Sequence, residues 1–227
     1  RRGAPSPTSP IGSEATVTEG IADGRRLHRP APAPEAMPRP LLSQRAEERL
    51  GPRHRQVLDQ LEQLFLEEGF AGISVRELAA NVGCSRRTLY ELAPSKDELV
   101  LGVLDRFLHR VGRTALDAID REQSHADCIR SYFRGGVELQ RLSQTFAEDL
   151  ADDPAARRLF DRHFRYVMAV TEELVAEGVA AGEFRQVSPA IVAGVLAGSG
   201  LYFNQVEITH PDPTDEMLDL VIRSILA

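Results

Sequence analysis

The 227 residues, 42% hydrophobic and 27% charged, are ordinary for a soluble globular protein and long enough to bury a sizeable core. The two cysteines, Cys84 and Cys128, form no CxxC motif, which argues against a disulfide framework or a zinc ribbon and fits a reducing cytosol. The net charge of −7 speaks against nucleic-acid binding through overall charge. Most of the acidic excess falls in residues 101–227, so any contact with DNA requires a local basic patch.

Residues 1–50 are predicted to be a disordered arm rich in proline and arginine. Most of the fourteen prolines stand in the first forty residues, where no apolar period is present. The arginines of this arm (Arg25, Arg26 and Arg29) could touch DNA phosphates. A solvated tail is the favoured interpretation.

After Pro52, apolar residues recur every three or four positions, which predicts an amphipathic helix that stops near Gly69. The run Ser74-Val75-Arg76-Glu77 has the pattern of a capping box and predicts a second helix over about 75–81. Gly83 then permits the positive φ of a tight turn.

Ser85 is a suitable cap for a third helix over roughly 85–92, which Pro94 ends. A second capping-box pattern, Ser95 to Glu98, opens a long fourth helix. Two short helices joined by a tight turn predict a helix-turn-helix DNA-binding domain over residues 51–98.

The third helix carries the residues expected to read DNA. Arg86 and Arg87 stand at its N-terminal end, where a recognition helix meets base edges, and an arginine fork matches guanine O6 and N7. Lys96, the only lysine in the chain, begins the fourth helix, whose free N–H groups favour a phosphate. The predicted DNA-binding residues are Ser74, Arg76, Ser85, Arg86, Arg87, Thr88, Tyr90 and Lys96.

Residues 99–227 are predicted to form a helical effector-binding and dimerisation domain. Beyond the fourth helix, helical patterns cover 125–147, 153–181, 188–206 and 214–226, without the alternation of a strand. The expected fold class is therefore all-α: an N-terminal three-helix helix-turn-helix domain followed by a C-terminal helical domain.

The last two helical segments, 188–206 and 214–226, are the predicted homodimer interface. Gly194 and Gly198 lie four residues apart in an apolar helix and allow close helix approach, as in a four-helix interface. An intramolecular core helix is the alternative. The apolar run is too short for a membrane span, so no membrane partner is expected.

Aromatic residues between 107 and 166 could line an apolar cavity for a small-molecule effector of unknown identity. The candidate pocket residues are Phe107, Phe133, Phe146 and Phe164. Aromatics at helical spacing are more often plain core. His109, Arg130 and Arg134 are candidate polar contacts.

No cofactor, metal or catalytic residue is predicted. His125 and Cys128 lie at i and i+3 but lack a second pair at ligand spacing, so ordinary packing is favoured over metal. Cys84 follows the turn beside two arginines, which could lower its pKa, but a small core residue is favoured over a redox switch. The acidic run Glu148, Asp149, Asp152 and Asp153 is interpreted as a helix cap.

Residues 55–99 resemble the DNA-binding domain of the TetR family of bacterial repressors. The resemblance rests on "LEQLFLEEGFAGISVRELAANVGCSRRTLY" and the following "PSKDEL". The C-terminal half is similar only in its helical layout and in short phrases such as "LADDPAARRLF" and "GVAAGEFR". The resemblance implies a homodimer that reads palindromic double-stranded DNA, with a C-terminal domain that binds a small molecule and releases the DNA.

Two positions depart from the family pattern. Ala93 replaces an aromatic that usually packs the third helix on the fourth, at an expected cost of about 2–4 kcal/mol unless a neighbour such as Leu92 refills the space. Glu91 replaces a residue that is commonly neutral or aromatic and would repel phosphate. The leading hypothesis is a ligand-responsive repressor, and the alternative is a helical dimeric interaction module with weakened DNA binding.

Overall fold

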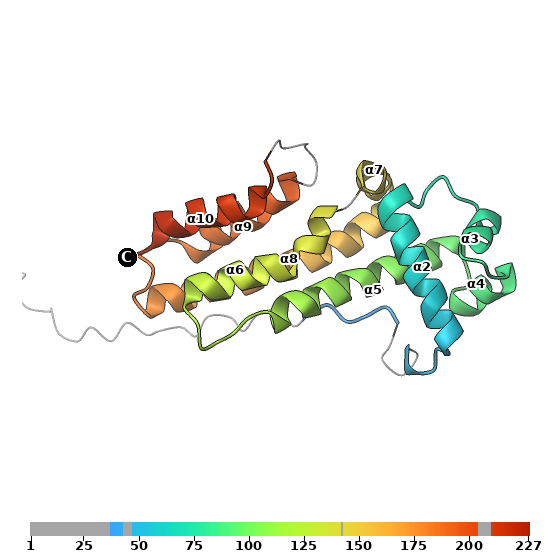
Figure 1. Cartoon of the computed structure of the whole chain (residues 1–227), viewed down its shortest axis with the longest axis horizontal. Coiled ribbons are helices and arrows are strands. Elements are labelled where there is room, and N and C mark those ends of the chain that lie inside the picture. Colours follow the sequence, from blue (N-terminus) through green and yellow to red (C-terminus); the bar gives the residue numbers. More distant parts are fainter. Residues whose placement is uncertain (1–36, 43–46, 142, 204–209) are drawn as a thin grey trace, which may run out of the picture. The chain divides into compact units, whose positions relative to one another are not determined.

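The structure, a computed structural model, describes residues 37–42, 47–141, 143–203 and 210–227, all within one unit that spans Ala31–Ala227. The described residues form nine α-helices and one 3₁₀ helix (Figure 1). They contain no β-strand, only an isolated bridge between Phe184 and Leu226. The predicted all-α class is confirmed.

Local capping sets the bounds of the first three helices. Helix α2 (Pro52–Glu68) begins with proline in its first turn and ends at Gly69, which has φ +81°. Helix α3 (Val75–Asn81) starts with the predicted capping box, in which Ser74 and Glu77 each bond the other's backbone N–H. Gly83 has φ +59°, and α4 (Arg86–Leu92) begins at the cap Ser85.

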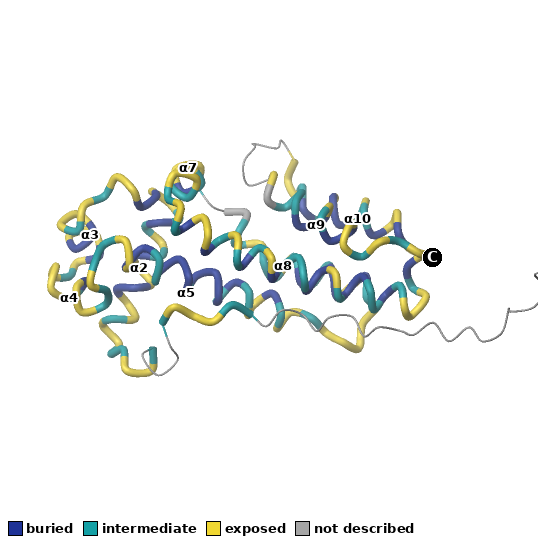
Figure 2. Tube along the Cα trace, turned by 180° about the vertical axis from the view of Figure 1, so that it is seen from behind, coloured by how far each residue is buried: buried dark blue, intermediate teal, exposed yellow. Residues whose placement is uncertain are grey.

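Helix α5 (Lys96–Asp117) continues directly from this domain. Its cap Ser95 accepts a hydrogen bond from the N–H of Glu98. Its buried residues recur along the helix from Leu99 to Ala115. Figure 2 shows buried positions along the length of α5. One long helix therefore contacts both the DNA-binding helices and the remaining helices.

The predicted helix over 125–147 is wrong, because the chain breaks there twice. Helix α6 (His125–Gly135) ends at two successive glycines, the 3₁₀ helix η1 (Val137–Arg141) follows, and α7 (Gln144–Asp152) starts afresh at the cap Ser143. A Cβ on Gly135 would lie 2.7 Å from the Ala115 Cα, so this glycine permits close packing of α6 on α5.

The last three helices agree with the expected positions. They are α8 (Pro154–Ala180), α9 (Pro189–Phe203) and α10 (Pro213–Ile225), and α9 packs against both α8 and α10. Residues 204–206 of the predicted interface lie outside the described residues. None of the described helices combines the length and apolar character that a membrane span requires.

Two clusters of buried side chains make up the core. The first joins α2, α3 and α4 to the N-terminal two thirds of α5, and also takes in Phe146 of α7 and Leu159 of α8. The second lies among the end of α5 and helices α6, α8, α9 and α10. The predicted boundary at residue 98 is therefore no boundary in packing, because α5 belongs to both clusters.

Part of the predicted disordered arm is in contact with the helices. The backbone N–H of Leu41 donates to Asp105 Oδ2 at 2.7 Å, and the carbonyl of Pro38 lies 2.6 Å from His109 Nε2. Met37 packs against the second cluster. For residues 37–42 the expectation of a solvated tail is therefore wrong, while residues 1–36 and 43–46 lie outside the described residues.

We expect Gly135→Ala to lower the free energy of unfolding by about 1–3 kcal/mol, because its methyl group would meet the α5 backbone, which cannot move aside as a flexible side chain does. Urea denaturation measures the change. The matched control is Gly102→Ala in α5, where nothing lies within 4 Å of the added Cβ. That variant should be neutral or more stable by up to about 1 kcal/mol. Equal stability of both variants would contradict the close α5–α6 contact.

Candidate nucleic-acid interface and ligand cavity

Helix α4 presents its N-terminal arginines to solvent. The side chain of Arg87 is 89% exposed, and Arg86 is also exposed and makes no hydrogen bond or ion pair with any described residue. Leu89, only 2% exposed, anchors the other face of α4 in the first core cluster. The arginine forks are therefore available to an external partner while the helix itself is held.

The predicted hydroxyl contacts have structural partners of their own. Ser85 Oγ accepts the Thr88 N–H at 3.1 Å and lies 3.0 Å from Thr88 Oγ1. Ser74 is engaged in the capping box of α3, while Arg76 beside it is exposed. Tyr90 is 54% exposed. Tyr90 and Arg76 are thus accessible, whereas the two serines act first as caps.

Lys96 has a role that the sequence did not indicate. Its ammonium group donates a 2.8 Å hydrogen bond to the carbonyl oxygen of Ala71, in the loop between α2 and α3. The same loop is held from another direction, because Asp149 of α7 accepts the N–H groups of Phe70 and Ala71. Lys96 therefore fastens the loop to the start of α5, and its contact with phosphate stays a prediction.

Glu91 is paired with two basic side chains. Its Oε1 lies 3.0 Å from Arg87 Nε on the same helix, and its Oε2 lies 3.4 Å from His54 Nε2 on α2. Hydrogen bonds from Arg87 and His54 lower the pKa of Glu91. The expected clash of a lone carboxylate with phosphate is thus moderated by its two partners.

Ala93 ends α4 as its C-cap. Both Ala93 and its neighbour Leu92 pack against the first core cluster. Leu92 therefore contributes apolar contact next to the position where an aromatic side chain was expected.

Two residues that position the α3–α4 turn were missed in the sequence. Arg53 donates through Nη2 to the carbonyl of Gly83 at 2.5 Å, and His54 holds Glu91 of α4. Both stand in the first turn of α2, at sequence separations of 30 and 37 from their partners. No local pattern marks such a contact, so only the three-dimensional structure reveals it.

An apolar cavity of about 100 Å³ lies where the two core clusters meet. Phe133 of α6 and Phe164 of α8 line it, whereas Phe107 and Phe146 do not. Those two are nearly fully buried in the first core cluster, where they fill space between helices. Helical spacing does not distinguish a core position from a cavity wall, and the effector-binding role of all four residues stays a prediction.

Other cavity-lining residues come from α5, α6, η1, α8, α9 and the N-terminal segment. They include Met37, Leu108, Val111, Tyr132, His163 and Val167. Burial strongly raises the pKa of the Tyr132 phenol, so this hydroxyl stays protonated. The walls are mostly apolar and aromatic with few polar atoms, which suits an apolar small molecule with one or two hydrogen-bonding groups.

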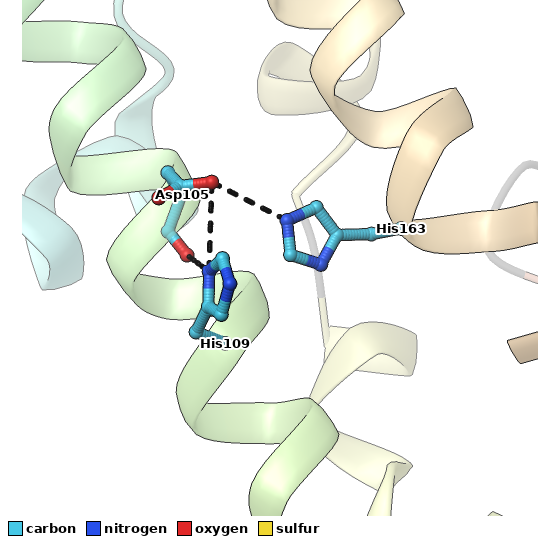
Figure 3. A group of neighbouring side chains, drawn as sticks. All are labelled: Asp105, His109 and His163. Atoms are coloured by element: carbon cyan, nitrogen blue, oxygen red, sulfur yellow. Dashed lines mark hydrogen bonds and ion pairs between the residues drawn. The ribbon is translucent and has the colours of Figure 1, made fainter. Parts of the chain in front are cut away.

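Asp105, His109 and His163 form a buried polar cluster beside this cavity (Figure 3). Asp105 Oδ1 lies 3.3 Å from His163 Nε2 and 3.5 Å from His109 Nδ1. Burial opposes ionisation of Asp105, but hydrogen bonds from His163 and from the Leu41 N–H outweigh it and lower the pKa of Asp105. Burial lowers the pKa of His163, which favours its neutral form.

The remaining polar candidates have structural partners. His125 Nδ1 lies 2.8 Å from Glu183, and the Cys128 thiol donates to the carbonyl of Asp120, so these two side chains face different partners. Arg130 bonds Asp127 and Asp219 on the protein, and Arg134 bonds Asp215. None of these residues lines the cavity described above.

Cys84 packs against the first core cluster, as the favoured interpretation expected, whereas the acidic run acts as a helix cap only through Asp153. Burial raises the pKa of Cys84, contrary to the idea of a thiolate activated by neighbouring arginines. Asp153 caps α8 by accepting the N–H groups of Ala155 and Ala156, and Asp149 holds the α2–α3 loop.

Residues 57–103 match the model of the family described as bacterial regulatory proteins, tetR family. This segment of the chain carries the DNA-binding domain of the TetR family. The matched residues include α3, the turn, α4 and the start of α5, which are the elements that expose Arg86 and Arg87. The resemblance seen in the sequence is therefore confirmed, and the helix-turn-helix assignment with it.

The chain is also similar to a bacterial regulator and to two solved structures. The HTH-type transcriptional regulator YezE of Bacillus subtilis is 25% identical over 115 residues, which span 47% of this chain and 59% of that relative. The crystal structure of reduced NemR from E. coli superposes with a TM-score of 0.65 at 21% identity, covering 77% of this chain and 97% of NemR. AibR, solved with isovaleryl coenzyme A and operator DNA, superposes with a TM-score of 0.58 at 16% identity, covering 77% of this chain and 98% of AibR.

The fold shared with these solved structures covers 77% of this chain, so it includes C-terminal helices as well as the DNA-binding domain. At such low identity the likeness shows the fold alone. The residues assigned to the cavity are therefore those that line it in this chain.

Replacing Phe107 or Phe164 by alanine should distinguish a core position from a position in the cavity wall. Phe107→Ala removes a ring that is 1% exposed in the first core cluster and should lower the free energy of unfolding by about 3–5 kcal/mol. Phe164→Ala only enlarges an existing cavity and should cost clearly less. Chemical denaturation of both variants measures the difference, and equal losses would contradict these placements.

Proposed function

We propose that this TetR-family protein is a ligand-responsive transcriptional repressor that binds a palindromic operator as a homodimer. Residues 51–98 form its DNA-binding domain, and residues 99–227 bind the effector and form the dimer. The observation that carries the proposal is the exposed pair Arg86 and Arg87 at the N-terminus of an α4 that several contacts hold in place.

Base recognition is assigned to α4 and positioning to its neighbours. Arg86 is without a protein partner among the described residues, so it is the better candidate for a bidentate contact with guanine. Arg87 shares its guanidinium with Glu91 and is suited to the DNA backbone. Arg76, Tyr90 and the remaining donors of Lys96 lie on or next to the same helices and would add phosphate contacts.

The homodimer is supported by an uncovered apolar surface on α9 and α10. Ile191, Val195 and Leu220 are 69%, 46% and 72% exposed, although each belongs to a helix that also packs inward. Exposed apolar side chains on adjacent helices are suited to burial against a second copy related by twofold symmetry. A twofold dimer would present two copies of α4 to two half-sites.

Effector response is supported by the position of the apolar cavity. It lies against α5, whose N-terminus carries Lys96 and holds the α2–α3 loop. A ligand that favours one arrangement of α5 and α8 would shift the spacing of the two α4 helices in the dimer. AibR, which was solved with isovaleryl coenzyme A and operator DNA, is a structural neighbour in which both partners are present.

The first test compares DNA binding by the wild type, Arg86→Ala and Arg185→Ala, each over a range of salt concentrations. The wild type should lose affinity steeply as salt rises, because phosphate contacts release counterions. Arg86→Ala should weaken binding to the preferred sequence by about 1–3 kcal/mol and relax its base preference. Arg185, an exposed arginine before α9, is the matched charge control and should bind as the wild type does.

A wild type that binds no DNA at low salt would contradict the proposal and favour the alternative, a helical dimeric interaction module with weakened DNA binding. Equal base preference in Arg86→Ala and wild type would contradict only the part of the proposal that gives Arg86 a role in base recognition.

The second test addresses the dimer. Leu220→Glu places a charge in the proposed interface and should convert the dimer to monomer in sedimentation velocity, because an unpaired charge is costly to bury. Tyr90→Glu is the control, since Tyr90 is 54% exposed on α4, in the DNA-binding domain rather than beside α9 and α10. A Leu220→Glu chain that stays dimeric would exclude this surface.

A further inference from the structure

We infer that Asp105, His109 and His163 form a binding site for a divalent transition metal of the zinc type. The three residues are 2%, 3% and 7% exposed, and each offers a nitrogen or oxygen ligand. Their ligand atoms all lie within 4.8 Å of one another. Asp105 and His109 stand four residues apart on one face of α5, and His163 reaches across from α8 (Figure 3).

The spacing of the ligand atoms suits tetrahedral coordination. Asp105 Oδ1 is 3.3 Å from His163 Nε2 and 3.5 Å from His109 Nδ1. Bonds of about 2.0–2.1 Å in a tetrahedral zinc site separate neighbouring ligands by about 3.3–3.4 Å. These two separations match such a site, and rotation of the two histidine rings would bring all three atoms, which lie within 4.8 Å of one another, around one ion with water in the fourth position.

The hydrogen bonds of His109 leave one ring nitrogen directed at the acidic centre. Nε2 lies 2.6 Å from the carbonyl oxygen of Pro38, which can only accept, so Nε2 carries a proton. Nδ1 lies 2.8 Å from the carbonyl oxygen of Asp105 and 3.5 Å from its carboxylate. Nδ1 is therefore the ring nitrogen that faces Asp105, and it is the ligand atom that His109 would offer to an ion.

The outer contacts resemble those of a prepared metal site. A ligating histidine commonly donates its other N–H to a backbone carbonyl, as His109 does to Pro38. The second carboxylate oxygen of Asp105 accepts the N–H of Leu41 at 2.7 Å, which fixes the orientation of Oδ1. Nitrogen and oxygen ligands in this combination suit Zn²⁺, Co²⁺ or Ni²⁺ better than Ca²⁺ or Mg²⁺.

One positive charge competes with the metal. Arg162 Nη2 lies 3.3 Å from Asp105 Oδ1. The Arg162 side chain is 38% exposed, so its guanidinium can turn into solvent when an ion takes its place. Because its Nε is buried without a hydrogen-bond partner among the described residues, the inward position of Arg162 is poorly satisfied.

A bound ion would join three parts of the chain. It would link α5 to α8 directly, and through Leu41 and Pro38 it would hold the N-terminal segment 37–42. His163 and Met37 also line the apolar cavity, so the ion would lie at its polar edge. Metal binding here does not depend on DNA binding.

The test uses the full chain stripped of metal with a chelator and then titrated with Co²⁺, followed by displacement with Zn²⁺. The wild type should bind a single ion per chain and give the intense visible absorption of tetrahedral Co²⁺. Asp105→Asn and His163→Gln should weaken binding by more than about 100-fold, since loss of even an outer partner costs about 10–100-fold. Circular dichroism establishes that each variant is folded.

Matched controls exclude the other ligands of the chain. His125→Gln and a Cys84→Ser/Cys128→Ser double variant alter residues outside the cluster and should keep the Co²⁺ spectrum unchanged. A folded wild type that binds neither ion overturns the proposal. Equal loss of binding in His125→Gln and His163→Gln overturns it as well, because it would place the ion elsewhere.

Discussion

The structure depends on one constraint: the 22-residue helix α5 belongs to both cores. Its N-terminal two thirds pack on the helices that present Arg86 and Arg87, and its C-terminal half forms a wall of the apolar cavity. A packed helix cannot shift at one end and keep the same contacts at the other. The cavity and the DNA-binding helices are therefore mechanically connected without a flexible linker, which is what a ligand-responsive regulator requires.

The loop between α2 and α3 is the second point of connection. Lys96 of α5 holds the carbonyl of Ala71, while Asp149 of α7 holds the N–H groups of Phe70 and Ala71. Because α7 also packs on α8, movement of α8 around a ligand would act on this loop as well as on α5. The single lysine of the chain thus stabilises the position of the DNA-binding domain, in addition to any contact it makes with phosphate.

Much of the first domain could be predicted because its signals are local. Ser74 with Glu77, Gly83 and Ser85 each act within four residues, and the structure places all three features where the sequence indicated them. The break after Gly135 was missed because this glycine packs closely against Ala115, which is near it in space but not in sequence. The contacts of Arg53 with Gly83 and of Asp105 with His163 were missed for the same reason, because the partners are distant in sequence. Nor could the sequence distinguish Phe107, a core residue, from Phe164, which lines the cavity.

We propose that exposed arginines on a firmly held α4 read DNA despite the negative charge of the chain. Selection of bound sequences from a random pool of duplex DNA by the purified protein, at two salt concentrations, tests this reading of DNA. We expect enrichment of a palindrome at low salt and loss of binding at high salt. Absence of any enriched sequence at low salt, from protein shown to be folded, would contradict it.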